Sequence, residues 1–154
     1  MTAHESLMFL PPESCADLKE EERFHLNCSL ITNALFLKAA HLLLTKVLYP
    51  NTSTSDDLIQ KDVELIMDYL ELIPPYHPIC SALPWPIMVA GSASLLSIHR
   101  KYLIERTLEI GDYVHTQYSC QIIDFFKKAW GTGEEEGMGC DILLHRESLE
   151  KLCL

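Results

Sequence analysis

The sequence predicts an all-α protein of about five helices, arranged as a single bundle-like or helical-array domain. In each long segment apolar residues recur at steps of three and four, the spacing of one helix face. No stretch alternates apolar and polar residues as a half-buried strand would. The 154 residues suit one compact domain, with 48% hydrophobic and 22% charged residues. We therefore expect a flexible N-terminal arm over residues 1–20 and one helical domain over 21–154.

The first long helix is predicted within residues 18–50. Its apolar positions form a wide face, made by Leu30, Ala34, Leu37, Leu44 and Leu48 with Ile31, Leu35 and Leu42 beside them. Such a width is typical of a helix buried on most sides. His41 falls on this face and is expected to be a hydrogen-bonded core residue. Pro50 and the following "NTSTS" end the helix.

A second helix is predicted to follow, from a plausible N-cap at Ser55 to the pair Pro74 and Pro75. Asp56 and Asp57 suit the positive end of the helix dipole. Its apolar stripe consists of Leu58, Ile59, Val63, Ile66, Met67, Leu70 and Ile73. Three acidic residues fall mainly on the opposite side of this helix, namely Asp62, Asp68 and Glu71.

The segment "ALPWPIMVAG" at residues 82–91 follows an irregular, proline-rich stretch. Pro86 suits the first turn of a helix, where its missing N–H costs little. Trp85 is expected to wedge between helices, and Gly91 to let a neighbouring helix approach closely. The helical pattern then continues to residue 110, so one long helix is predicted over 87–110.

The remaining chain is predicted to form two more helices. Gly111 can close the long helix, and Asp112 can cap a helix over residues 112–130. A turn rich in glycine and glutamate spans 131–139. A short terminal helix is predicted over 140–154.

Composition excludes several classes of function. Twelve Lys and Arg residues stand against 22 Asp and Glu, which gives a net charge of −10. A phosphate backbone would be repelled, so direct binding to nucleic acid is not expected. No apolar run reaches the roughly 20 residues of a membrane span, and the N-terminus lacks the features of a secretory signal. We expect a soluble protein without membrane contact, in the cytoplasm or the nucleus.

Cofactor and metal sites are not expected either. The six cysteines are scattered, without a C-x-x-C pair, and are interpreted as reduced thiols that are partly buried. His77, His99 and His115 lack the spacing of a metal site. No complete catalytic motif is present. Cys80 lies three residues from His77, but one local histidine does not make a nucleophile.

The tryptophan segment nevertheless resembles a signature of the helical regulatory region of fungal-specific transcription factors. In that family a W-P-x-x-x-A-G segment opens a core helix, and Trp85, Pro86, Ala90, Gly91 and Arg100 fit it. The segments "NALFLKAAHLLLTKVLYP", "DVELIMDYLELIPP" and "FFKKAW" look like other family helices in the same order. The resemblance covers roughly residues 25–154 and implies a helical regulatory domain.

One departure from the family pattern bears on function. Family members usually carry an N-terminal binuclear zinc cluster with six cysteines, and this sequence shows neither the cluster nor its basic linker. We therefore expect that the chain does not bind DNA in the family's way. It looks like the C-terminal part of such a regulator.

Two classes of function remain. The first is a free-standing regulatory domain that binds a protein partner or a small hydrophobic effector, with a homodimer as a further option. The alternative is a small helical enzyme of fungal secondary metabolism, of the cyclase or isomerase type. Such catalysis needs only a shaped apolar pocket with one or two acid–base groups. The lack of a catalytic motif favours the first class.

A small-molecule site is predicted at the irregular stretch 76–85. Polar side chains converge over apolar walls in such segments. We expect Tyr76, His77 and Trp85 to line the site, with His99 or Tyr102 contributed by the following helix. In an enzyme, His77 or His99 would be the acid–base group, because histidine titrates nearest to neutral pH.

Overall fold

The computed structural model describes residues 18–114 and 117–152. This part is all-α, as predicted, and its named elements include no strand. They are α2 (Glu20–Leu48), α3 (Asp57–Glu71), the 3-10 helix η2 (Pro78–Ala82), α4 (Pro84–Ser92), α5 (Ser97–Val114), α6 (Tyr118–Trp130), the 3-10 helix η3 (Gly139–Leu144) and α7 (Arg146–Glu150). The predicted arm over 1–20 lies almost wholly outside the described residues, which begin at residue 18, and its last residue, Glu20, starts α2.

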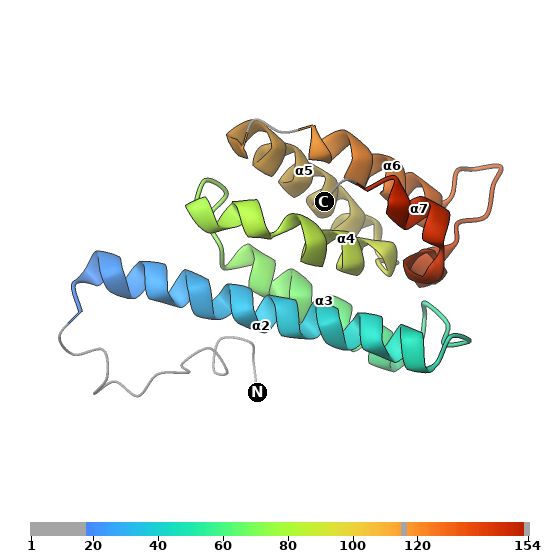
Figure 1. Ribbon diagram of the computed structural model, residues 1–154, viewed down its shortest axis with the longest axis horizontal. Coiled ribbons are helices and arrows are strands. Elements are labelled where there is room, and N and C mark those ends of the chain that lie inside the picture. The colour runs from blue at the N-terminus through green and yellow to red at the C-terminus, as the bar shows by residue number, and fades with distance from the viewer. Residues whose placement is uncertain (1–17, 115–116, 153–154) are drawn as a thin grey trace.

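Helix α4 lies at the centre of the array. It contacts α2 and α3 on one side and α5 and α6 on the other, and it also meets both 3-10 helices (Figure 1). Every residue from Pro86 to Ser92 is buried. A helix that is apolar on all sides is stable only where other elements of the protein cover every face. The segment singled out in the sequence is therefore the core helix of the fold.

Two predictions about this segment are confirmed. Trp85 packs between helices, with its ring stacked on Phe36 of α2 at a centroid distance of 5.5 Å. Gly91 allows α6 to approach α4, because a Cβ atom at Gly91 would lie 2.1 Å from Cε1 of Phe126. The two helices therefore meet at a contact that no larger residue could occupy without displacing an aromatic ring.

The predicted long helix over 87–110 is wrong, because the chain breaks it at residues 93–96. Ala93 and Ser94 close the end of α4 with tight turns to Ala90 and Gly91. Serine competes with helical hydrogen bonds, and the Ser92 hydroxyl indeed donates to the Val89 carbonyl at 2.7 Å. The helix boundary predicted at Gly111 is also wrong, since α5 continues through it to Val114.

Helix α2 is not buried on most sides, contrary to the prediction. One face packs on the core through Cys28, Ile31, Thr32, Leu35, Ala39, Leu42 and Lys46. The other face leaves Leu37, Leu44 and Leu48 more than half exposed, at 71%, 53% and 62%. By length and composition α2 could also cross a membrane, although 39% of its most apolar stretch is buried inside the protein.

His41 is exposed and therefore is not the core residue that was predicted. Asp62, which lies opposite the main apolar stripe of its helix, is nevertheless only 4% exposed. The Asp62 carboxylate lies 2.5 Å from Nδ1 of His41, so this buried acidic group is hydrogen-bonded to an exposed histidine.

Candidate functional site

His77, the central residue of the predicted site, is held by two hydrogen bonds. Its Nδ1 accepts the Ile79 N–H at 3.1 Å and so caps η2. Its Nε2 lies 2.8 Å from Nδ1 of His25, near the start of α2. Because Nδ1 accepts, a neutral His77 carries its proton on Nε2 and donates it to His25. Both ring nitrogens of His77 are therefore occupied by structural contacts.

The other predicted site residues contact different parts of the fold. Tyr76 is 67% exposed and meets the ring of Tyr113, at the end of α5. Trp85 faces α2, as described above. His99 lies in the first turns of α5 and is half-buried, and Tyr102 follows one turn later. Within residues 18–114 and 117–152 no hydrogen bond or ring contact joins any two of these five residues to each other, and their role in ligand binding stays a prediction.

Beneath this stretch lies a buried polar cluster that holds it in place. Arg106 is 3% exposed and donates to the Ile73 carbonyl at 2.6 Å. The same nitrogen lies 3.8 Å from Sγ of Cys80. Burial raises the pKa of Cys80, and the opposing effect of Arg106 is smaller. Burial likewise raises the pKa of Tyr102. Both groups stay protonated near neutral pH, which fits a structural role better than nucleophilic catalysis.

The His77 contacts predict a pH-dependent stability. Burial, and secondarily His25, lower the pKa of His77 below its ordinary value of 6.5. The unfolded chain therefore takes up this proton at higher pH than the folded chain. We expect the melting temperature to be highest above about pH 6.5 and to fall as the pH drops below it.

His77→Asn tests this expectation, because asparagine can still cap η2 but does not titrate. Melting curves between pH 5 and pH 8 should show a shallower acid slope for His77→Asn than for the wild type. His99→Asn, which removes a histidine without a cap role, should keep the wild-type slope. Equal slopes for all three proteins would contradict the assignment.

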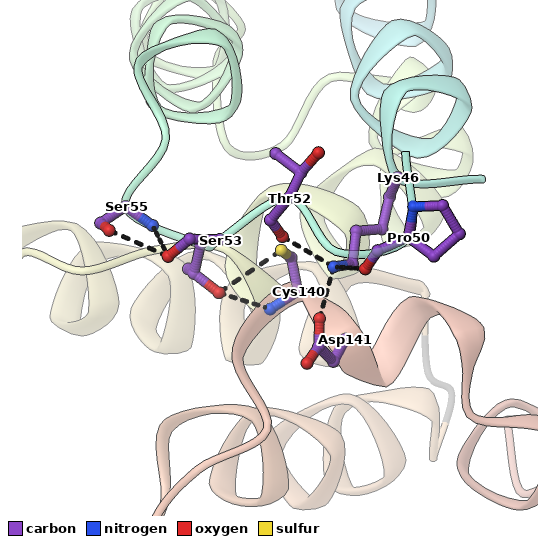
Figure 2. Close-up of polar contacts among 8 residues, drawn as sticks. Lys46, Pro50, Thr52, Ser53, Ser55, Cys140 and Asp141 are labelled. Carbon is purple, nitrogen blue, oxygen red and sulfur yellow. Dashed lines mark hydrogen bonds and ion pairs between the residues drawn. The ribbon is translucent and has the colours of Figure 1, made fainter. Parts of the chain in front are cut away.

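A buried lysine fixes the opposite end of α2. The Lys46 side chain is 0% exposed, and Nζ donates to the carbonyls of Pro50 and Thr52 at 2.5 and 2.7 Å. It also pairs with the carboxylate of Asp141 in η3, as Figure 2 shows. All three N–H bonds of the ammonium therefore have acceptors. Sequence reasoning missed this residue, because a lysine in a helical apolar segment gives no sign of its distant partner.

The loop after α2 is fastened to η3 by a second contact. The Cys140 N–H donates to the Thr54 hydroxyl at 3.0 Å. Gly139 precedes it with a φ of +58°, and a Cβ there would lie 2.2 Å from Oγ1 of Thr54. Lys46 and Thr54 together set the position of the loop that enters α3 relative to η3.

The surface most suited to binding a macromolecule is the outer face of α2. We define it by six exposed residues: Leu37, Ala40, His41, Leu44, Val47 and Leu48. Four of them, Leu37, Ala40, Leu44 and Val47, follow the alternating three- and four-residue steps of a coiled-coil seam. A contiguous apolar stripe of this kind marks an interaction site more often than single exposed leucines do.

Charge distinguishes this face from the rest of the molecule. Residues 23–55 contain no aspartate or glutamate, although the whole chain carries 22. Lys38 and His41 lie on or beside the outer face. The stretch that forms this face is thus free of acidic residues on a protein with a net charge of −10, and the carboxylate of Asp62 that contacts His41 is buried. Another apolar surface can approach it without facing a like charge.

Comparison with known proteins gives a family assignment. The model of the fungal specific transcription factor domain matches residues 5–137, which is most of the chain. No curated protein and no solved structure gave a match. The match includes α2, the core helix α4 with its Trp85 and Gly91, and α6. The chain therefore belongs to the fungal-specific transcription factor domain family.

Proposed function

We propose that this chain is a regulatory domain that pairs with a second copy of itself through the outer face of α2. Family membership supports the regulatory role. The observation behind the pairing is that α2 is apolar on two faces and buries only one of them. A helix that is apolar on all sides belongs in a core or an interface.

A second copy fits this face for reasons of shape and charge. If two α2 helices pack antiparallel about a two-fold axis near residue 42, Leu37 meets Val47 of the other copy. Ala40 then meets Leu44, so a small side chain faces a large one. Both surfaces lack acidic residues over 23–55, which avoids the repulsion that other contacts between such acidic chains would create. Two-fold pairing is also the commonest form of self-association.

The enzyme alternative receives less support from the geometry. Both ring nitrogens of His77 are engaged, by Ile79 and His25, so this residue has no free nitrogen for a substrate proton. We likewise propose that the domain makes no direct contact with DNA, because its charge opposes one. A nuclear location is proposed from the family alone.

Leu44→Glu tests the pairing. Light scattering behind a sizing column should give a dimer mass for the wild type and a monomer mass for the variant. In the proposed register each glutamate would face Ala40 of the other copy and would lose its hydration there. Leu44 is 53% exposed, so the melting temperature at low protein concentration should change little.

Leu108→Glu is the matched control, since Leu108 is a leucine of α5 that is 46% exposed. It should leave the mass unchanged. A wild-type protein that stays monomeric at concentrations of several hundred micromolar would overturn the proposal. So would flotation of the wild type with anionic vesicles that Leu44→Glu abolishes, because the face would then bind lipid.

A further inference from the structure

A second surface, separate from the outer face of α2, has the features of a small-molecule site. It is a cleft of about 260 Å³ where the end of α4, the start of α5 and the end of α6 meet. The loop after α6 closes it, held by the Met138 N–H donating to the Lys128 carbonyl at 3.1 Å. Residues important for its chemistry are Ser94, Leu95, Arg100, Trp130, Glu136 and Met138.

Arg100 is fixed in this cleft before any ligand binds. Its Nε donates to the Ser94 carbonyl at 2.9 Å, and its guanidinium lies over the Trp130 ring at 5.1 Å. Trp130 is itself held, because its Nε1 donates to the Gly91 carbonyl at 2.7 Å and its ring stacks on Phe126. A guanidinium held on one side by a backbone bond and by a ring loses little freedom when it binds an anion.

The terminal nitrogens of Arg100 take part in no ion pair or hydrogen bond within residues 18–114 and 117–152. Glu136 lines the same cleft without pairing with Arg100 there. Ser94 is 1% exposed, and its hydroxyl has no partner among the described residues. The Ser94 oxygen is itself buried, so it is not open to a ligand in the cleft. Among the described residues, the donors left free in the cleft are therefore the terminal nitrogens of Arg100.

We propose that this cleft binds a small molecule with an oxyanion, and specifically a carboxylate, on an apolar body. Arginine binds carboxylates through two parallel hydrogen bonds, which the terminal nitrogens of Arg100 can supply. Leu95, Ala129 and Met138 provide apolar contacts for the body of the ligand. Phosphate offers the same oxygens, but its second negative charge is less compatible with Glu136 and with a net charge of −10.

Trp130 can report binding directly. The chain has two tryptophans, so Trp85→Phe leaves Trp130 as the only indole, inside the cleft. Hexanoate should change its fluorescence saturably, whereas hexanamide, with the same body but no charge, should bind about tenfold more weakly or not at all. Inorganic phosphate should also bind more weakly than hexanoate. Tighter binding of phosphate, or equal binding of hexanamide, would overturn the carboxylate assignment.

Arg100→Gln in the same background should weaken hexanoate binding by about tenfold or more. Lys101→Gln removes the same charge from the neighbouring residue, which points away into solvent at 78% side-chain exposure, and should leave binding unchanged. Arg100→Lys keeps the positive charge but lacks the two parallel donors of the guanidinium, so it should also weaken hexanoate binding. It serves as the test if Arg100→Gln proves unstable. The proposal would be overturned if both Arg100 variants still bind hexanoate as tightly as the parent protein. It would also be overturned if Lys101→Gln weakens hexanoate binding as much as Arg100→Gln does. Dimer mass is measured separately, so the two proposals can fail independently.

Discussion

Gly91→Ala is expected to lower the free energy of unfolding by about 1–3 kcal/mol, the usual cost of overpacking a core. The new Cβ would lie 2.1 Å from Cε1 and 2.5 Å from Cζ of Phe126. That ring is 0% exposed and stacked on Trp130 at 4.8 Å, so it cannot turn away without disturbing a second aromatic residue. Alanine gains about 1 kcal/mol over glycine within a helix, which offsets only part of this cost.

Urea unfolding followed by circular dichroism would measure the loss as a lower transition midpoint with an unchanged slope. Gly133→Ala is the control, because a Cβ at Gly133 would meet nothing within 4 Å. It should stay within about 0.5 kcal/mol of the wild type. A Gly91→Ala protein as stable as this control would mean that α4 and α6 separate easily. The close contact would then contribute little to the fold.

The role of this helix could be predicted from the sequence because its signals are local. Two prolines, a tryptophan and an apolar run ending in glycine lie within ten residues, and each acts on its own segment. The fold class followed from the three- and four-residue spacing for the same reason. The break after Ser92 was missed, since serines and small residues weaken a helix without preventing one. The tight turns of Ala93 and Ser94 back to Ala90 and Gly91 end the helix there.

The outer face of α2 could not be distinguished from a core face. Leu37 and Leu44 show the same helical spacing as Leu35 and Leu42, yet the first pair is exposed and the second is buried. Periodicity reports that a face is apolar, and it does not report what covers that face. The buried face is decided by contacts with α3, the next helix along the chain, and with the more distant α4.

Polar partners were missed for a related reason. His25 and His77 lie 52 residues apart, and no feature of either segment predicts that their rings meet. Asp62 is another case, since an aspartate opposite an apolar stripe normally faces solvent, but here it pairs with His41. For the predicted site, His77 was a candidate acid–base residue because histidine titrates nearest to neutral pH. One of its nitrogens is occupied by the local cap on Ile79, and only the tertiary contact with His25 shows that the other is occupied too.

Lys46 provides the other large expected effect. Lys46→Met keeps most of the aliphatic stem but removes the donor to the carbonyls of Pro50 and Thr52 and to the carboxylate of Asp141. Both carbonyls lie in partly buried contacts, and an acceptor left there without a partner costs up to about 1–3 kcal/mol. We therefore expect a loss of about 2–4 kcal/mol in the free energy of unfolding, read from urea transitions as for Gly91.

Two further variants separate the causes of that loss. Lys38→Met removes a partly exposed lysine from the same helix and should cost less than about 0.5 kcal/mol. Asp141→Asn removes the charge of a carboxylate that is 66% exposed while leaving both carbonyl acceptors in place. Because water already solvates that carboxylate, Asp141→Asn should cost clearly less than Lys46→Met. If Asp141→Asn costs as much as Lys46→Met, the ion pair to η3, and not the two carbonyl bonds, is what makes the buried lysine stabilising.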